Sequence, residues 1–252
     1  MMASETLKRM PTKQARLLLG AIVVSLLALF ASAGSVSGDE ARSVTAGSDG
    51  FAAHTCAIIE DGTVRCWGGN DKGQLGIGVT TDAHPTPASV CADAACETLL
   101  EGVVAVSAGG RFTCAVVVDL VKCWGWNNYS QLGTGVSGGQ STIPVNVCAD
   151  TACESALSGA SDVEAGDRHT CALMVSGGIK CWGRNDDAAL GDGSRESRTT
   201  PVDVTGLTSG ATSVVAGAHH TCALTTSGGA KCWGNANFGR LETATRGAAP
   251  AF

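Results

Sequence analysis

Cysteine is the residue type of this sequence whose number and spacing point most directly to chemistry. The twelve cysteines form close pairs along the chain: Cys56 with Cys66, Cys91 with Cys96, Cys114 with Cys123, Cys148 with Cys153, Cys171 with Cys181, and Cys222 with Cys232. Such thiols can be oxidised to disulfides or can bind a metal ion. The absence of Cys-x-x-Cys spacing argues against a zinc site, so we predict disulfides and no metal. The sequence leaves the connectivity open, and the recurrence of the same close pair favours local partners.

Groups that could act as acids, bases or nucleophiles are few and scattered. No phosphate-binding loop, nucleophile motif or His-Glu-x-x-His motif is present. Three histidines hold the same position in similar segments, which favours packing or hydrogen-bonding roles on separate units: His54, His169 and His220. One acidic cluster keeps a hydrolase or lyase acting on extracellular polymers as the alternative function: Asp186, Asp187 and Asp192. We predict no catalytic residue and no cofactor.

The tryptophans divide into a recurring set and an isolated one. Four of them follow the second cysteine of a pair, and we expect them to pack between neighbouring units: Trp67, Trp124, Trp182 and Trp233. Trp126 occurs outside this pattern, and the single tyrosine of the chain, Tyr129, follows it closely. Exposed aromatic side chains on loops suit protein recognition, so we predict that Trp126 and Tyr129 contribute to a binding surface.

These residues recur because the chain repeats itself. Four segments share Thr-Cys-Ala, a short turn and Cys-Trp-Gly: AHTCAIIEDGTVRCWGGNDKGQLGIG, RFTCAVVVDLVKCWGWNNYSQLGTG, RHTCALMVSGGIKCWGRNDDAALGDGS and HHTCALTTSGGAKCWGNANFGRLE. A short apolar run ending in Ala-Gly precedes each segment, and a segment with Pro and Val follows the first three. Recurrence at this spacing is typical of an architecture built from small repeated units.

Each recurring cysteine pair fits a β-hairpin. In the first segment, pairing Cys56 with Cys66 leaves a three-residue turn that ends in Gly62. The second segment is one residue shorter, so its turn is Val118-Asp119, where a β-branched residue resists positive φ. Directly opposed cysteines on neighbouring antiparallel strands lie close enough to form disulfides.

The hairpin, the preceding apolar strand and the following Pro-Val strand give about four strands per unit, which favours an all-β fold of four-stranded blades, a β-propeller. The motifs Val-x-Ala-Gly, His-Thr-Cys-Ala-Leu, Lys-Cys-Trp-Gly-x-Asn-x-x-Gly-Gln-Leu-Gly and Pro-Val-x-Val resemble the regulator of chromosome condensation repeat, in a cysteine-rich, secreted bacterial form. The resemblance implies the seven-bladed β-propeller of that family. Only about four repeats span residues 43–242, so we expect a partial or open propeller.

The fourth repeat departs from the family pattern. Ala236 stands where the other repeats have Asn, and Glu242 stands where they have Gly. Residues 243–252 form a tail without the repeat. A truncated fragment of a longer propeller protein is therefore a further alternative. Open blade edges would also favour self-association.

The resemblance implies binding to proteins instead of catalysis, with loops between strands as the recognition surface. A net charge of −6 excludes nucleic acid as the main partner, because phosphate contacts need a basic surface. For this reason the chromatin-linked nucleotide exchange of the eukaryotic namesake is not carried over. We predict an exported, non-enzymatic module that binds an unidentified protein or surface ligand.

Residues 1–33 have the features of an export signal. Basic residues precede an apolar run from Leu17 to Phe30, and the small-x-small pattern of Ala31 to Ala33 follows. We expect a linker at residues 34–42 and a secreted, periplasmic or cell-surface protein. An uncleaved membrane anchor is the alternative, and this segment would be the only part of the chain to contact a membrane.

Overall fold

The computed structural model describes residues 40–47 and 52–237, so the predicted export signal and the whole predicted tail of residues 243–252 lie outside it. The chain divides into two units, Met1–Glu40 and Ala41–Phe252, and every strand described below belongs to the second. Across the described ranges, no helix has the length and apolar character that spanning a membrane requires.

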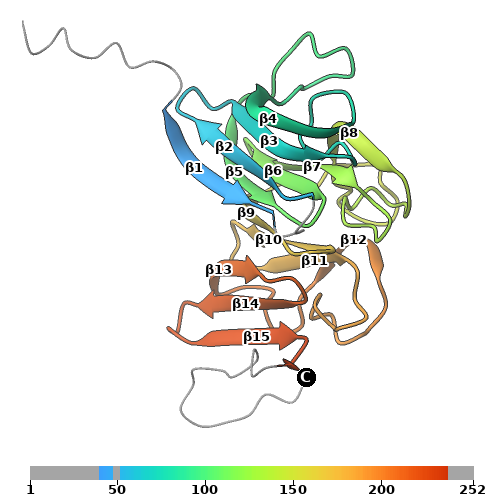
Figure 1. Ribbon diagram of the computed structural model, residues 1–252. Helices are drawn as coiled ribbons and strands as arrows, with labels where there is room; N and C mark the ends of the chain where they lie inside the picture. The colour runs from blue at the N-terminus through green and yellow to red at the C-terminus, as the bar shows by residue number, and fades with distance from the viewer. Residues whose placement is uncertain (1–39, 48–51, 238–252) are drawn as a thin grey trace, which may run out of the picture. The chain divides into compact units, whose positions relative to one another are not determined.

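Four antiparallel sheets follow one another along the chain (Figure 1). The first consists of β1 (Ala41–Ala46), β2 (His54–Ile59), β3 (Val64–Asn70) and β4 (Thr81–Ser89). The second consists of β5 (Val103–Ala108), β6 (Phe112–Val117), β7 (Leu120–Trp126) and β8 (Gln140–Asn146). The third consists of β9 (Ala160–Ala165), β10 (His169–Met174), β11 (Ile179–Gly183) and β12 (Arg198–Asp203). The fourth consists of β13 (Ala211–Ala216), β14 (His220–Thr225) and β15 (Ala230–Gly234).

Within each sheet the strands pair in chain order, so each sheet is a simple meander. The prediction of an all-β fold made of propeller blades is confirmed. The described residues supply only three strands to the fourth sheet, and the blades do not close into a ring.

The middle hairpin of each blade has the register that the cysteine spacing predicts, with the two cysteines directly opposed. This holds in all four blades, for Cys56 with Cys66, Cys114 with Cys123, Cys171 with Cys181, and Cys222 with Cys232. Each opposed pair is joined by a disulfide at a Cα–Cα distance of 4.1 Å. Each hairpin is therefore covalently fixed across its two central strands.

Two further disulfides close the insertion loops after the first and second blades. Cys91 is bonded to Cys96, and Cys148 is bonded to Cys153, each across a separation of five residues. Cys96 and Cys153 both have a φ of 53°, so the same left-handed turn brings each back to its partner. With these two links the structure contains six disulfides, and the described residues include no free cysteine.

The twelve cysteines differ in how deeply the fold buries them. The hairpin cysteines of the first three blades are completely buried, whereas Cys222 and Cys232 of the fourth blade are half-buried. In the insertion loops, Cys96 is half-buried and Cys153 is exposed. The hairpin disulfides of the first three blades thus belong to the core, while the loop disulfides hold surface turns in shape.

The short turn of the second blade has the backbone geometry that its sequence disfavours. Val118 has a φ of 61° and its side chain is largely exposed. A β-branched residue in this left-handed region is strained. The shorter spacing between Cys114 and Cys123 leaves no position for the glycine that ends the three-residue turns.

Hydrophobic cores lie at the boundaries between consecutive blades. Trp124 of the second blade packs into a cluster with Ile58, Leu75 and Val90 of the first. Trp182 and Trp233 occupy the equivalent clusters at the next two boundaries. Burying a side chain of this size stabilises the fold by roughly 3 kcal/mol, so blade packing depends strongly on these rings.

A shared hydrogen-bond pattern accompanies each buried tryptophan. Trp124 Nε1 and Thr113 Oγ1 both donate to the carbonyl oxygen of Gln74 in the preceding blade, at 2.9 Å and 2.8 Å. The same pattern recurs at the next two boundaries, where all four distances are 2.9 Å. Trp182 and Thr170 donate to the Gln131 carbonyl oxygen. Trp233 and Thr221 donate to the Ala189 carbonyl oxygen. One carbonyl in a tight loop thus orients the following blade.

Candidate functional site

The predicted binding residues, Trp126 and Tyr129, lie at the end of β7 and in the loop that follows it. Both are partly exposed. Their ring centroids are 5.3 Å apart with an interplanar angle of 87°, an edge-to-face contact. The structure therefore brings the two residues together.

Two arginines of the third blade pack against Tyr129. The Arg168 guanidinium carbon is 4.7 Å from the Tyr129 ring centroid, and that of Arg184 is 5.2 Å away. Arg168 Nη1 also donates to the Tyr129 hydroxyl at 3.1 Å. These contacts are within cation–π distance. We call the set Trp126, Tyr129, Arg168 and Arg184 the Tyr129 patch.

Carboxylates hold both arginines in place. Arg184 Nε donates to Asp186 Oδ2 at 2.7 Å, and this bond, with the nearby carboxylate charges, raises the pKa of Arg184. Arg168 Nε lies 3.0 Å from Asp167 Oδ2, close enough for an ion pair but without hydrogen-bond alignment. The two guanidinium groups are therefore held in position before a partner binds, and each has a neighbouring carboxylate that balances its charge.

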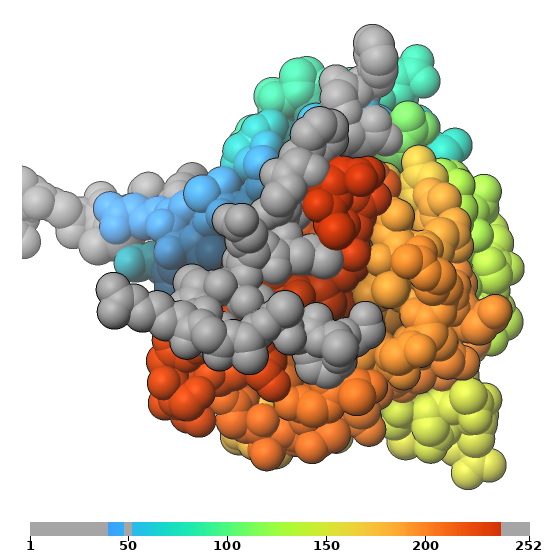
Figure 2. All heavy atoms as spheres, turned by 90° about the horizontal axis from the view of Figure 1, so that it is seen from below, coloured from blue at the N-terminus to red at the C-terminus, as the bar shows by residue number. Residues whose placement is uncertain are grey.

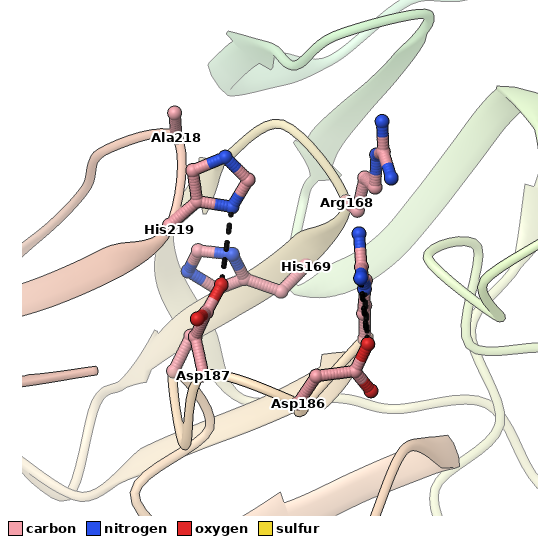
Figure 3. A pocket seen from close by; sticks show the side chains of 8 residues that line it. Arg168, His169, Asp186, Asp187, Ala218 and His219 are labelled. Carbon is pink, nitrogen blue, oxygen red and sulfur yellow. Dashed lines mark hydrogen bonds and ion pairs between the residues drawn. The ribbon is translucent and has the colours of Figure 1, made fainter. Parts of the chain in front are cut away.

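A small pocket lies beside the two arginines, between the third and fourth blades (Figure 3). It is lined by Arg168, Arg184, Asp187 and His219, with the ring of His169 beneath. Asp187 Oδ1 accepts from Asn235 Nδ2 at 3.0 Å, and its Oδ2 lies 3.4 Å from His219 Nδ1. The space suits the tip of a side chain and is too small for an organic ligand of ordinary size.

The contacts of this surface repeat from blade to blade. The residue before Phe112, His169 or His220 reaches back to the loop of the preceding blade in each case. The three contacts are Arg111 to Asp71 at 3.0 Å, Arg168 to Tyr129 and His219 to Asp187. Figure 2 shows the third and fourth blades side by side, in orange and red, as their strand contacts require.

The repeated histidines have the structural role predicted for them in two blades. His54 Nε2 lies 2.7 Å from Thr113 Oγ1, and His169 Nε2 lies 2.9 Å from Thr221 Oγ1, each across a blade boundary. Burial lowers the pKa of both imidazoles to about 4. These rings are neutral packing elements at physiological pH. His220, on the last blade, is only partly buried.

The acidic cluster is divided among separate ion pairs and hydrogen bonds. Asp186 pairs with Arg184 at 2.6 Å, and Asp192 pairs with Arg198 at 2.7 Å. Burial opposes ionisation of Asp192, but hydrogen bonds from Ser194 and Arg198 outweigh it and lower the pKa of this carboxyl. A carboxyl held ionised in this way is a poor general acid.

The two insertion loops use their aspartates to shape turns. Asp93 accepts backbone N–H bonds from Ala95 and Thr98, each at 2.9 Å, and Asp150 accepts one from Ala152 at 2.9 Å. The bonds from Ala95 and Ala152 lie within the loops that the disulfides of Cys96 and Cys153 close, and the bond from Thr98 ties the chain just after the first loop to it. No group of three potential metal ligands occurs anywhere in the described ranges.

Sequence reasoning found the aromatic half of the Tyr129 patch and missed the arginine half. Arg168 lies 39 residues after Tyr129 and belongs to the next blade. A usable signal was present, because the residue at this place is Ala53 in the first repeat, Arg111 and Arg168 in the next two, and His219 in the fourth. Variation at a fixed place in a repeat indicates a surface position.

The fold and its boundary hydrogen bonds define a β-propeller built from short repeats. The model of the regulator of chromosome condensation (RCC1) repeat matches residues 61–116, 121–173 and 176–224. A second RCC1 repeat model matches residues 42–74, 160–188 and 211–240. This chain belongs to the RCC1 repeat family, whose propeller domains are protein-binding modules and are usually non-catalytic.

Curated relatives include longer proteins of differing function. The chain is 31% identical over 203 residues to the ultraviolet-B receptor UVR8 of Arabidopsis thaliana, covering 77% of this chain and 42% of that protein. It is 35% identical over 181 residues to the E3 ubiquitin-protein ligase HERC2 of Homo sapiens, covering 71% of this chain and 4% of that protein. The chain thus spans less than half the length of either relative.

Solved structures agree on the fold. Human WBSCR16 superposes with a TM-score of 0.64 at 23% identity, covering 81% of this chain and 51% of that one. Prp20p of Saccharomyces cerevisiae gives a TM-score of 0.62 at 22% identity, covering 79% and 46%. At this identity the likeness establishes the arrangement of blades and nothing about partners.

Proposed function

We propose that this chain is an exported, non-enzymatic propeller module that binds a partner protein through the Tyr129 patch. The observation that carries the proposal is the composition of the patch. Trp, Tyr and Arg are the residue types that dominate binding energy at protein interfaces. Here four such side chains from two blades are held together at the end of β7 and on the adjoining loops.

The frame around the patch supports a recognition role. Tyr129 N–H donates to Gln131 Oε1 at 2.9 Å, and the Gln131 carbonyl receives Trp182 and Thr170 of the next blade. The loop that carries Tyr129 is therefore fixed at a blade boundary. A side chain held in this way loses little conformational entropy on binding, which strengthens an interface.

Export is supported by two features of the chain. Six disulfides favour an oxidising compartment, because cytosolic thiols are kept reduced. The basic and apolar pattern of residues 1–33 is typical of an export signal.

Site-specific photo-crosslinking tests the binding surface. A benzophenone amino acid replaces Trp126 in one variant and Lys122 in a control; both lie on β7, four residues apart. We expect an adduct of discrete mass from position 126 in the exported fraction of the source cells, and none from position 122. Adducts of equal yield at both positions, or at 122 alone, would contradict the proposal.

A further inference from the structure

The Tyr129 patch holds hydrogen-bond donors that its own acceptors do not use. Arg168 directs Nη1 to the Tyr129 hydroxyl and Nε toward Asp167. Arg184 directs Nε and Nη2 to the same oxygen of Asp186. Arg168 Nη2 and Arg184 Nη1 donate no hydrogen bond to a described residue. Each guanidinium therefore keeps one terminal nitrogen available.

Most acceptors around the pocket are occupied, but Asp186 Oδ1 accepts no hydrogen bond from a described residue. Asp187 Oδ1 accepts from Asn235, and its other oxygen faces His219. Asp186 Oδ2 receives two nitrogens of Arg184. A group entering between the arginines thus meets one spare nitrogen on each guanidinium, so an acceptor has two donors to bind there, with Asp186 Oδ1 open beside them.

We propose, resting on the function proposed above, that the Tyr129 patch receives an aspartate or glutamate side chain of the partner protein, seated against Arg168 and Arg184. The two guanidinium groups lie 4.7 Å and 5.2 Å from the Tyr129 ring centroid, and Figure 3 shows Arg168 beside the pocket. A planar carboxylate can accept from two such nitrogens at once. Trp126 and Tyr129 beside them supply the apolar contact that an anchor residue needs.

Charge balance selects a singly charged group. Each arginine of the patch already has a carboxylate neighbour, Asp167 or Asp186. Asp187 lines the same pocket, so the two arginines and three carboxylates leave no excess positive charge, and a single carboxylate is repelled less than a dianion. The net charge of −6 repels an acidic segment at long range, so we expect short-range contacts to decide affinity. Measurements at about 0.15 M salt limit that repulsion to roughly 8 Å.

Titration with defined peptides tests this proposal on the oxidised chain. The probe is an acetylated, amidated peptide with four glutamates and one leucine, and its matched control carries glutamines. We expect the glutamate peptide to bind at least about tenfold more tightly than the glutamine peptide. Arg168→Gln and Arg184→Gln should each weaken it about tenfold. Lys122→Gln removes the same charge four residues before Trp126 on β7 and should leave the affinity within about twofold.

Further measurements separate a loss of folding from a loss of binding, and the charge of the guanidinium from its planar geometry. Each variant must retain the disulfides and the thermal transition of the parent chain. Arg184→Lys keeps the charge and loses the planar fork, so we expect an intermediate affinity. Equal binding of the two peptides, equal weakening by Lys122→Gln, or no binding to the parent chain would overturn the carboxylate proposal. If crosslinks at position 126 persist in that case, the binding function stands and only the partner chemistry is wrong.

Discussion

Trp124 Nε1 donates to the carbonyl oxygen of Gln74 at 2.9 Å, so the indole of one blade is anchored on the loop of the blade before it. The same donor and the same loop position are used at all three boundaries of the described chain. This relationship links the sequence repeat to the function, because the anchoring loop of the second blade is also the loop that carries Tyr129.

Replacing a tryptophan at a blade boundary should weaken the packing between two blades and so lower the free energy of unfolding. Trp182→Phe removes the N–H that bonds the Gln131 carbonyl and leaves space in a packed cluster, so we expect a loss of about 2 kcal/mol in unfolding free energy. Trp67 is the matched control, because no described carbonyl accepts from it and its ring is partly exposed. Trp67→Phe should change stability by less than about 0.5 kcal/mol in urea titrations. Equal losses would contradict the boundary account.

A glycine beside each buried tryptophan should tolerate no side chain. Gly133 has a φ of 66°, and a Cβ there would lie 2.8 Å from Trp182 Nε1. We expect Gly133→Ala to cost about 3 kcal/mol, through backbone strain and displacement of the indole. Gly138→Ala, at a φ of 97° with open space around it, isolates the strain and should cost about 1 kcal/mol. Thermal unfolding of both variants measures the difference, and equal costs would show that the indole contact adds nothing.

The buried histidines should make the fold sensitive to acid. The pKa of His169 is about 4 in the fold, below its ordinary value of 6.5, because burial disfavours the imidazolium. The unfolded chain therefore takes up the proton first as the pH falls. Stability is fully present above about pH 6.5 and decreases toward pH 4, by up to about 3 kcal/mol.

The second blade provides the control for this prediction, because Phe112 occupies the equivalent position. His169→Phe should reduce the loss of stability between pH 6.5 and 4, and Phe112→His should increase it. Denaturant titrations at several pH values give the slopes. Identical slopes in the parent chain and both variants would show that these positions do not control the acid response.

Glu164 should have the opposite effect. Desolvation and the nearby Asp162 raise its pKa from 4.5 to about 7, although hydrogen bonds from Ser107 and the Ala216 N–H favour its charge. Stability from this group is complete below about pH 4.5 and is lost as the pH rises through 7. Solvent screening at this partly exposed position reduces the expected loss to about 1–2 kcal/mol. Glu164→Gln should be more stable than the parent chain at about pH 8 and equal to it at about pH 4, and a constant difference would contradict this assignment.

The sequence was sufficient to predict the blades and their hairpins, because short-range spacing determines both. A turn of given length fixes which residues oppose each other, so the pairing of Cys56 with Cys66 in register follows from local geometry. The packing role of Trp124, Trp182 and Trp233 also followed from their constant position, whereas the same expectation was wrong for Trp67, which is partly exposed and lies outside the boundary clusters. These features need no knowledge of how one blade lies against the next.

The full Tyr129 patch could not be predicted from the sequence in the same way. Its arginines approach Tyr129 only after two blades have packed, and the rotation between blades depends on the whole boundary core. The turn at Val118 shows a related limit. Sequence indicated poor turn chemistry there, and only the structure shows that the chain accepts a positive φ at an exposed valine.

The degree to which each disulfide is buried could not be predicted from the sequence either. Cys232 occupies the same place in its repeat as Cys181, yet Cys181 is fully buried and Cys232 is only half-buried. Burial of a hairpin cysteine depends on the packing of neighbouring blades, and spacing along the chain does not report it. The left-handed turns at Cys96 and Cys153 are a second example, because cysteine has no special preference for positive φ.

Non-reducing peptide mapping of the exported, oxidised chain tests the central claim most directly, since the rigid frame of the binding surface depends on disulfides within single hairpins and loops. The account predicts six links, each joining cysteines at a separation of 5 to 10 residues, with no link between blades. Free thiols at Cys171 and Cys181, or any link between cysteines of different blades, would contradict it.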